Sequence, residues 1–241
     1  MMNTAEIEKN MTQRYPTIIE EIGRLIDICV EKAMFIVKNK NEWIANQDSR
    51  FAVYGKYISS LNATRILLYQ SVDFLSKGNW QEIYNLNFSV GGQKNDFVYL
   101  LELNRQIMFA SYLSFFSEFE SSTGIIYRHL NNKGDHFATN YKGFIIDNLK
   151  LTTYHNLIDI MKFARNTIHN NGIHIPDNST NDNISLNYKS LTVNFNKNKS
   201  VIIEWKEFLI IYEEIIELTD AIHKHSLIDN EKEIRDIVCD A

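Results

Sequence analysis

The residues best suited to chemistry lie in one polar run from Arg165 to Gly172, with the sequence RNTIHNNG. Arg165 and His169 are four positions apart, so their side chains are neighbours on a helix. Asn166 lies beside them, and Lys162 is one turn back towards the start of the helix. A guanidinium binds phosphate, and a histidine near a helix end can move protons near neutral pH. The polar run therefore indicates a site for acid–base chemistry on a phosphodiester.

A long helix must position these side chains. Hydrophobic spacing predicts it from about Phe144 to Asn171, and Gly172 and Pro176 are suited to end it. At about 100° per residue, one stripe of this helix is apolar and is expected to pack on the core. The polar run lies at the end of a neighbouring stripe, so the candidate site is expected at the boundary between core and solvent.

A purely structural role for the same residues stays open. A histidine is common in the last turn of a helix, where it interacts favourably with the helix dipole. Arg165 could lie along the core and pair with a carboxylate. The three residues Asn170, Asn171 and Gly172 could simply stop the helix.

The composition bounds the class of protein. The chain has 241 residues, of which 44% are hydrophobic, and only nine are Gly and two are Pro. These values predict one sizeable core built from long helices. The net charge of −5 argues against a protein that coats nucleic acid, but it allows a local phosphate site. Cys29 and Cys239 have no metal-binding spacing, and no apolar run reaches membrane-spanning length, so we expect a cytoplasmic protein without metal or cofactor.

Hydrophobic positions recur at helical spacing in five long segments. These segments are one that begins at residue 17, residues 48–77, 95–121 and 144–171, and one that begins at residue 205. Thr17 and Glu20 have the spacing of a capping box, which predicts the start of the first helix. Residues 95–121 are apolar on all sides, which predicts a central, buried helix.

The hydrophobic pattern changes between residues 184 and 204, where β-branched and aromatic residues alternate with polar ones. Leu191, Val193 and Phe195 are expected on one face, and the polar stretch 196–200 is expected to be the loop of a β-hairpin. The sequence thus predicts a mainly α fold, an up-and-down helical bundle with one β-hairpin before the last long helix. Residues 1–90 are expected to form an N-terminal helical layer on the same core, and residues 91–241 the bundle with the hairpin.

Arg165 and Asn166 followed by His169, at the end of a helix in a helical bundle, resemble the signature of the HEPN superfamily. These dimerising helical bundles occur in RNA-cutting toxins, phage-defence proteins and RNA-processing enzymes. The resemblance in arrangement covers residues 95–222. The hairpin that follows the polar run is similar to a bacterial branch of the superfamily.

The resemblance implies a metal-independent endoribonuclease that acts in phage defence or as a toxin. In such an enzyme the RNA 2′-hydroxyl attacks the adjacent phosphate, and Arg165, Asn166 and His169 would be the catalytic residues. Lys162 and Asn170 would bind substrate. The resemblance also implies a homodimer that brings two copies of the site together, with an antitoxin or another protein as a possible partner.

Within such a dimer, the helix stripe formed by Tyr154, Ile158 and Met161 is a candidate contact surface, because it leads directly to the polar run. A second hypothesis is a non-catalytic dimer of the same fold that binds RNA, a nucleotide or a partner protein. Only three residues separate Arg165 from His169, fewer than is usual in the family, and this shorter spacing favours the second hypothesis.

Other candidates are weaker. His223 and His225 are two positions apart on a predicted helix, so they point to different sides and do not indicate a metal site. Glu118 and Glu120 diverge for the same reason and do not indicate a carboxylate pair. Cys29 lies on an apolar helix face, where a core role is expected.

Overall fold

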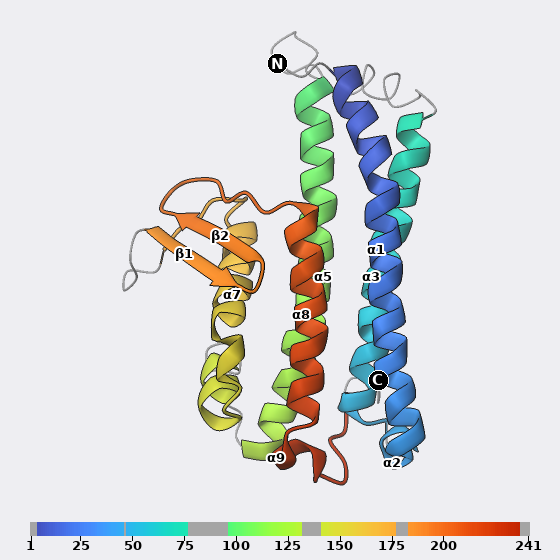
Figure 1. The fold of residues 1–241 in the computed structure, drawn as a ribbon, viewed down its shortest axis with the longest axis vertical. Coiled ribbons are helices and arrows are strands. Elements are labelled where there is room, and N and C mark those ends of the chain that lie inside the picture. Colours follow the sequence, from blue (N-terminus) through green and yellow to red (C-terminus); the bar gives the residue numbers. More distant parts are fainter. Residues whose placement is uncertain (1–3, 46, 77–95, 132–140, 177–182, 237–241) are drawn as a thin grey trace.

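The computed structural model describes residues 4–45, 47–76, 96–131, 141–176 and 183–236. The fold is mainly α, with one two-stranded antiparallel hairpin before the last long helix, which confirms the predicted class. Four long helices run up and down beside one another (Figure 1). They are α1 (Thr4–Asn39), α3 (Ser49–Ser76), α5 (Asp96–Asn131) and α8 (Trp205–His223). None of the described helices combines the length and the apolarity that a membrane crossing requires.

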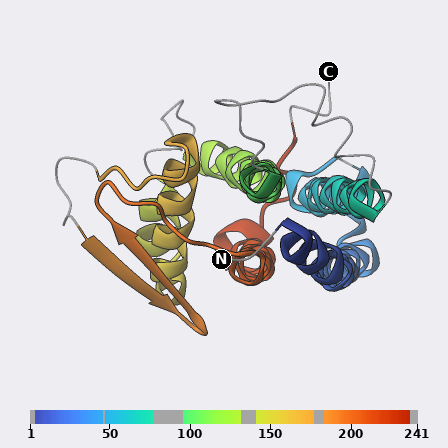
Figure 2. The ribbon, with the colours of Figure 1, turned by 90° about the horizontal axis from the view of Figure 1, so that it is seen from above.

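The elements that carry the polar run lie on one side of this bundle. Figure 2 shows α7 (His155–His169) beside α5 and α8, with the hairpin across its outer side. The hairpin consists of β1 (Asn183–Tyr188) and β2 (Leu191–Asn196). Two short helices, α2 (Asn41–Ala45) and α9 (Ser226–Asp229), lie at the end of the bundle where α1 and α8 finish.

The core is rich in aromatic side chains, many of them on α5. The Phe115 ring stacks on Tyr57 of α3 with centroids 4.5 Å apart, and it lies 4.7 Å from Tyr212 of α8. Such ring pairs add to the stability gained from burying their area. One cluster of buried apolar side chains extends from Met11 to Ile234, so α1, α3, α5, α7 and α8 share a core.

The first helix begins earlier than predicted. Helix α1 starts at Thr4 and contains Pro16, so Thr17 is not an N-cap and the predicted capping box is wrong. A proline inside a helix removes one backbone hydrogen bond. Burial offsets this loss, because Met11 and Tyr15 pack into the core before the proline, and the Tyr15 hydroxyl donates to Asn104.

The helix predicted at 144–171 is interrupted. Phe144–Asn148 forms one π-helical turn, and a short 3₁₀ turn at Thr152–Tyr154 precedes α7. Between these turns Lys150 has a φ of 56°, in the left-handed region. Phe144, Ile145 and Leu149 are buried around this break, so packing selects a geometry that hydrophobic spacing alone does not reveal.

The predicted hairpin is present, but its turn was placed wrongly. Tyr188 pairs with Leu191, so the strands reverse at Lys189 and Ser190 and not at residues 196–200. Lys189 has a φ of 49° although it is not a glycine, and its ammonium binds Glu214 of α8. The expected alternation is confirmed, because Leu191, Val193 and Phe195 are all buried. Residues 196–200 instead return the chain to the segment after α7, where Ser200 pairs with Ile173.

Candidate functional site

A compact backbone motif ends α7 within the polar run. Asn171 donates its backbone N–H to the carbonyl of Ile168 at 3.0 Å, and Gly172 donates to the carbonyl of Thr167 at 2.8 Å. Asn171 has a φ of 58° and Gly172 a φ of 87°. This pair of bonds is a Schellman motif, which satisfies the last carbonyls of the helix. The residues expected to stop the helix therefore do so.

Arg105 of α5 fixes this helix end in place. Its Nη1 donates to the backbone carbonyl of Asn171 at 2.9 Å, and its Nη2 donates to the Asn171 side chain at 3.2 Å. Glu102 holds the same guanidinium with two hydrogen bonds of 2.9 and 2.7 Å. A Cβ at Gly172 would lie 3.1 Å from Arg105 Nη1, so the close approach favours glycine there.

Arg165 lies at the edge of α7 that faces α5. Its Nε is 3.5 Å from Oε2 of Glu120, and the arginine side chain is 37% exposed. Burial raises the pKa of Glu120, and the positive charge of Arg165 only partly opposes this effect. This one long contact and the partial exposure of the side chain leave the guanidinium accessible to an anion. A role for Glu120 was missed in the sequence, because its partner is far along the chain and on another helix.

The other residues of the predicted site share the open face of α7. Lys162 and His169 are exposed, and Asn166 and Asn170 are half-buried. Across the described ranges, no hydrogen bond or ion pair connects Arg165 with His169. The structure thus brings the predicted residues to one solvent-facing strip of α7, but it does not join them into a bonded network. We call Lys162, Arg165, Asn166, His169 and Asn170 the α7 strip.

Three further polar residues, Tyr141, Lys142 and Asp159, lie near the α7 strip. Tyr141 is buried, and burial raises its pKa, with smaller contributions from the charges of Glu120 and Asp159. Lys142 binds both carboxylate oxygens of Asp159, at 2.7 and 2.8 Å. The negative charge of Asp159 is therefore balanced, and it does not cancel the positive charge of the α7 strip.

The stripe expected to form a dimer surface is internal. Ile158 and Met161 are fully buried, and Tyr154 stacks on Tyr188 of the hairpin with ring centroids 6.4 Å apart. This prediction was wrong because the hairpin, α5 and α8 of the same chain cover the stripe. Hydrophobic spacing shows that a stripe is buried, but not which surface buries it.

Exposed apolar side chains lie instead just after the end of α7. Ile173, Ile175 and Ile202 are 39%, 54% and 82% exposed, and we call them the isoleucine ledge. Ile173 pairs with Ser200, and Gly172 accepts a hydrogen bond from Val201. Because alternate residues of extended segments share a face, the three isoleucines project to the same side. The ledge adjoins the α7 strip at its C-terminal end.

A surface pocket lies elsewhere on α7. It has a volume of about 480 Å³ and lies between the start of the helix and the hairpin turn. His155, Asn156 and Lys189 are among its lining residues, and none of the α7 strip residues lines it. This pocket therefore does not coincide with the residues that the sequence singled out.

His225 and Cys29, two other residues considered in the sequence, have structural roles. His225 is the N-cap of α9, and its Nδ1 accepts the backbone N–H of Leu227 at 3.3 Å. Cys29 is fully buried, which confirms its core role, and Cys239 lies outside the described residues. Within the described ranges, no three potential metal ligands come together.

His223 is the exception among these candidates. Its side chain is 4% exposed, and neither ring nitrogen has a hydrogen-bond partner in the described part of the chain. Burial, assisted by the charge of Arg50, lowers the pKa of His223 to about 3. The imidazole is therefore neutral at physiological pH.

This burial predicts a specific loss of stability in mild acid. In the unfolded chain a histidine has a pKa of about 6.5, so between pH 6.5 and 3 the unfolded state binds a proton that the folded state does not. The free energy of unfolding is thus highest above pH 6.5 and falls below it by up to about 1.4 kcal/mol per pH unit. Urea unfolding at pH 7, 6 and 5 should show this fall. The same series on His223→Phe is the control, and parallel curves for the two proteins would contradict the prediction.

Comparison of the chain with known protein families, with curated proteins and with solved structures gives no significant match.

Proposed function

We propose that the α7 strip is an RNA-phosphate site and that the protein is a HEPN-like, metal-independent endoribonuclease. One observation carries the proposal. Arg165 is partly exposed, and it makes only one long contact, of 3.5 Å, to the half-buried Glu120, so the guanidinium can still donate hydrogen bonds to a phosphate. Lys162 and His169 are exposed on the same helix face. Phosphate would thus meet two cations and an imidazole along one helix edge.

The proposed reaction is an internal transfer. The RNA 2′-oxygen forms a bond to phosphorus, and the bond from phosphorus to the 5′-oxygen of the next nucleotide breaks. His169 takes the proton of the 2′-hydroxyl, and Arg165 stabilises the charge that develops on the phosphate oxygens. Asn166 positions the scissile phosphate, while Lys162 and Asn170 bind neighbouring groups of the RNA. The leaving 5′-oxygen needs a proton, which the partner's His169 would supply in a dimer.

A two-fold homodimer is part of the same proposal. The isoleucine ledge offers an exposed apolar contact surface next to the α7 strip, and we propose that two copies of the chain meet there, with their strips near one another. Covering the ledge in this way would remove exposed apolar area from water. An antitoxin or another protein could regulate activity by binding the same ledge, in phage defence or in a toxin system.

The test is incubation of the purified protein with mixed single-stranded RNA in the presence of EDTA. We expect cleavage products that end in a 2′,3′-cyclic phosphate, because the 2′-oxygen remains bound to phosphorus. The same oligonucleotides made with 2′-O-methyl groups are the control and should stay intact. Cleavage of the methylated strands, or complete dependence on added metal ions, would overturn the proposed chemistry.

A non-catalytic RNA-binding dimer is the second candidate. The absence of a hydrogen bond or ion pair between Arg165 and His169 in the described chain favours it, because catalysis requires the two groups to act on one phosphate. Binding of RNA to the wild-type protein, weakened in Arg165→Ala and without any cleavage, would select this candidate. Failure of both binding and cleavage would leave the helix-stop role as the function of the polar run.

A further inference from the structure

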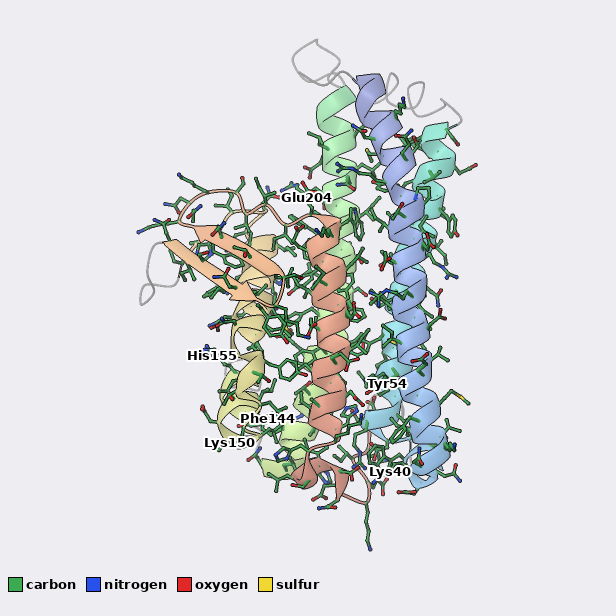
Figure 3. The ribbon with its side chains drawn as sticks, in the orientation of Figure 1. Lys40, Tyr54, Phe144, Lys150, His155 and Glu204 are labelled. Carbon is green, nitrogen blue, oxygen red and sulfur yellow. The ribbon has the colours of Figure 1, made fainter. Side chains whose placement is uncertain are left out.

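A second candidate site lies at the end of the bundle where α1 and α8 finish. A small pocket of about 30 Å³ opens there beside the buried His223 ring. Figure 3 shows two of its lining residues, Lys40 and Tyr54, in this lower part of the molecule. The pocket is independent of the α7 strip, because none of the strip residues lines it.

The lining is rich in hydrogen-bond acceptors. Asp220 and His223 lie three positions apart on α8, and both line the pocket. His223 is neutral, so one of its ring nitrogens is available as a hydrogen-bond acceptor, and neither ring nitrogen has a partner in the described chain. A buried polar group without a partner is unfavourable, so a ligand that donates a hydrogen bond to the ring would gain affinity from it. The Asp229 carboxylate adds a further acceptor from α9.

The walls and the helix ends also favour positive charge. Trp43, Tyr54 and Phe35 supply aromatic rings, whose faces attract cations. The C-terminal ends of α1 and α8 meet at this end of the bundle, and the helix dipole makes such ends favourable for cations. The described residues offer no cluster of three metal ligands, so an organic cation fits this lining better than a metal ion.

At this pocket, the ammonium groups of Lys40 and Lys224 each contact a carboxylate and an aromatic ring. Lys40 binds Asp229 at 2.9 Å, with its Nζ 5.2 Å from the Trp43 ring centroid. Lys224 binds Asp220 at 2.8 Å, with its Nζ 5.6 Å from the Phe35 ring centroid. The Lys224 side chain is 60% exposed, so it can leave the pocket for solvent at little cost.

We propose that this pocket binds a small primary alkylammonium ion, which displaces the Lys224 side chain and donates hydrogen bonds to the Asp220 carboxylate and to a ring nitrogen of His223. The pocket as it stands has room for about one water molecule. Withdrawal of the Lys224 side chain makes space for a short alkyl chain. A quaternary ammonium ion has no N–H group, and it leaves His223 without a partner.

The test is titration of the wild-type protein with propylammonium chloride at constant ionic strength, followed by the ¹H–¹³C NMR signal of the His223 ring. His223→Phe identifies this signal among those of the seven histidines. We expect a saturable shift with propylammonium and no shift with tetramethylammonium or potassium chloride. Equal shifts with all three salts, or no shift with propylammonium, would overturn the proposal.

Two variants sharpen the test. Asp220 accepts hydrogen bonds from both Lys32 and Lys224, each at 2.8 Å. Lys224→Met removes the more exposed of these two ammonium groups and leaves Lys32 in place, so it should bind propylammonium about two- to fivefold more tightly. Lys206→Met removes an exposed lysine at the other end of α8 and should bind like the wild type. Asp220→Asn should weaken binding. Weaker binding by Lys224→Met than by Lys206→Met would show that Lys224 is not the displaced group and would refute the proposed exchange.

Discussion

Replacing His169 by alanine should lower the rate of RNA cleavage by about 10²–10⁴-fold, the usual contribution of a general acid–base group. The side chain is exposed at the end of α7. It makes no hydrogen bond or ion pair within the described ranges, so its removal leaves the helix and the Schellman motif intact. The loss should therefore appear in the cleavage rate and not in the melting temperature. The measurement is the rate of appearance of cyclic phosphate ends under single-turnover conditions with EDTA.

His155→Ala is the matched control, because His155 is an exposed histidine on the same helix. It lies outside the α7 strip, and its cleavage rate should stay within about twofold of the wild type. Equal rates for His169→Ala and the wild type would rule out His169 as the proton carrier. Mixing wild-type protein with an excess of His169→Ala tests the shared cleft, since each mixed dimer has only one of the two histidines that the reaction requires. A fall in the cleavage rate per wild-type subunit supports two copies per site, and an unchanged rate contradicts it.

Replacing Arg50 by methionine should lower the free energy of unfolding by about 3–5 kcal/mol, the usual cost of leaving one partner of a buried ion pair alone. Arg50 and Asp48 are fully buried, with Nη2 and Oδ2 2.6 Å apart. The guanidinium also donates to the backbone carbonyls of Ile228 and Glu231, and it stacks over the Trp43 ring at 3.7 Å. Methionine fills similar space but satisfies neither Asp48 nor the two carbonyls. Urea unfolding at pH 7 measures the loss.

Arg24→Met is the control, because Arg24 forms comparable ion pairs with Glu21 and Glu213 but is 46% exposed. Exposed pairs contribute about 0–1 kcal/mol, so this variant should unfold nearly as the wild type does. A double variant, Asp48→Leu with Arg50→Met, removes both buried charges and should recover part of the loss. Similar losses for Arg50→Met and Arg24→Met would contradict the buried-pair argument.

The sequence predicted the long helices well because their hydrophobic spacing is strong. Helix α3 (Ser49–Ser76) follows the predicted segment 48–77 closely, and α8 begins at the predicted Trp205. The errors occur where tertiary packing outweighs local rules. Pro16 lies inside α1 because buried residues precede it, and the hairpin turns at Lys189 because Glu214 of another helix binds its ammonium. The sequence near Pro16 does not show which residues will be buried, and the sequence near Lys189 does not show that Glu214 will bind it.

The sequence predicted which helix carries the candidate site, but it did not predict which residues of other helices surround the site. Spacing alone placed Arg165 and His169 on one edge of a helix, and the structure has both on the solvent-facing side of α7. Glu120 and Arg105 approach from α5, and their positions depend on how the two helices pack. The proposed binding role of His223 could not be predicted, because residues of α1, α2, α3, α8 and α9 together line the pocket beside it.

The buried Asp48–Arg50 pair also sets an order of events when the chain is synthesised. Asp48 accepts the backbone N–H of Ile234, 186 residues later, and Arg50 donates to the carbonyl of Ile228. A growing chain emerges from the ribosome N-terminus first, so both charges must wait for these partners until almost all of the described residues are out. Helices α1 and α3 can pair early, but the buried hydrogen bonds at this end of the bundle can form only after translation has passed residue 234. Ribosome-bound intermediates should therefore be open at the end that later holds His223.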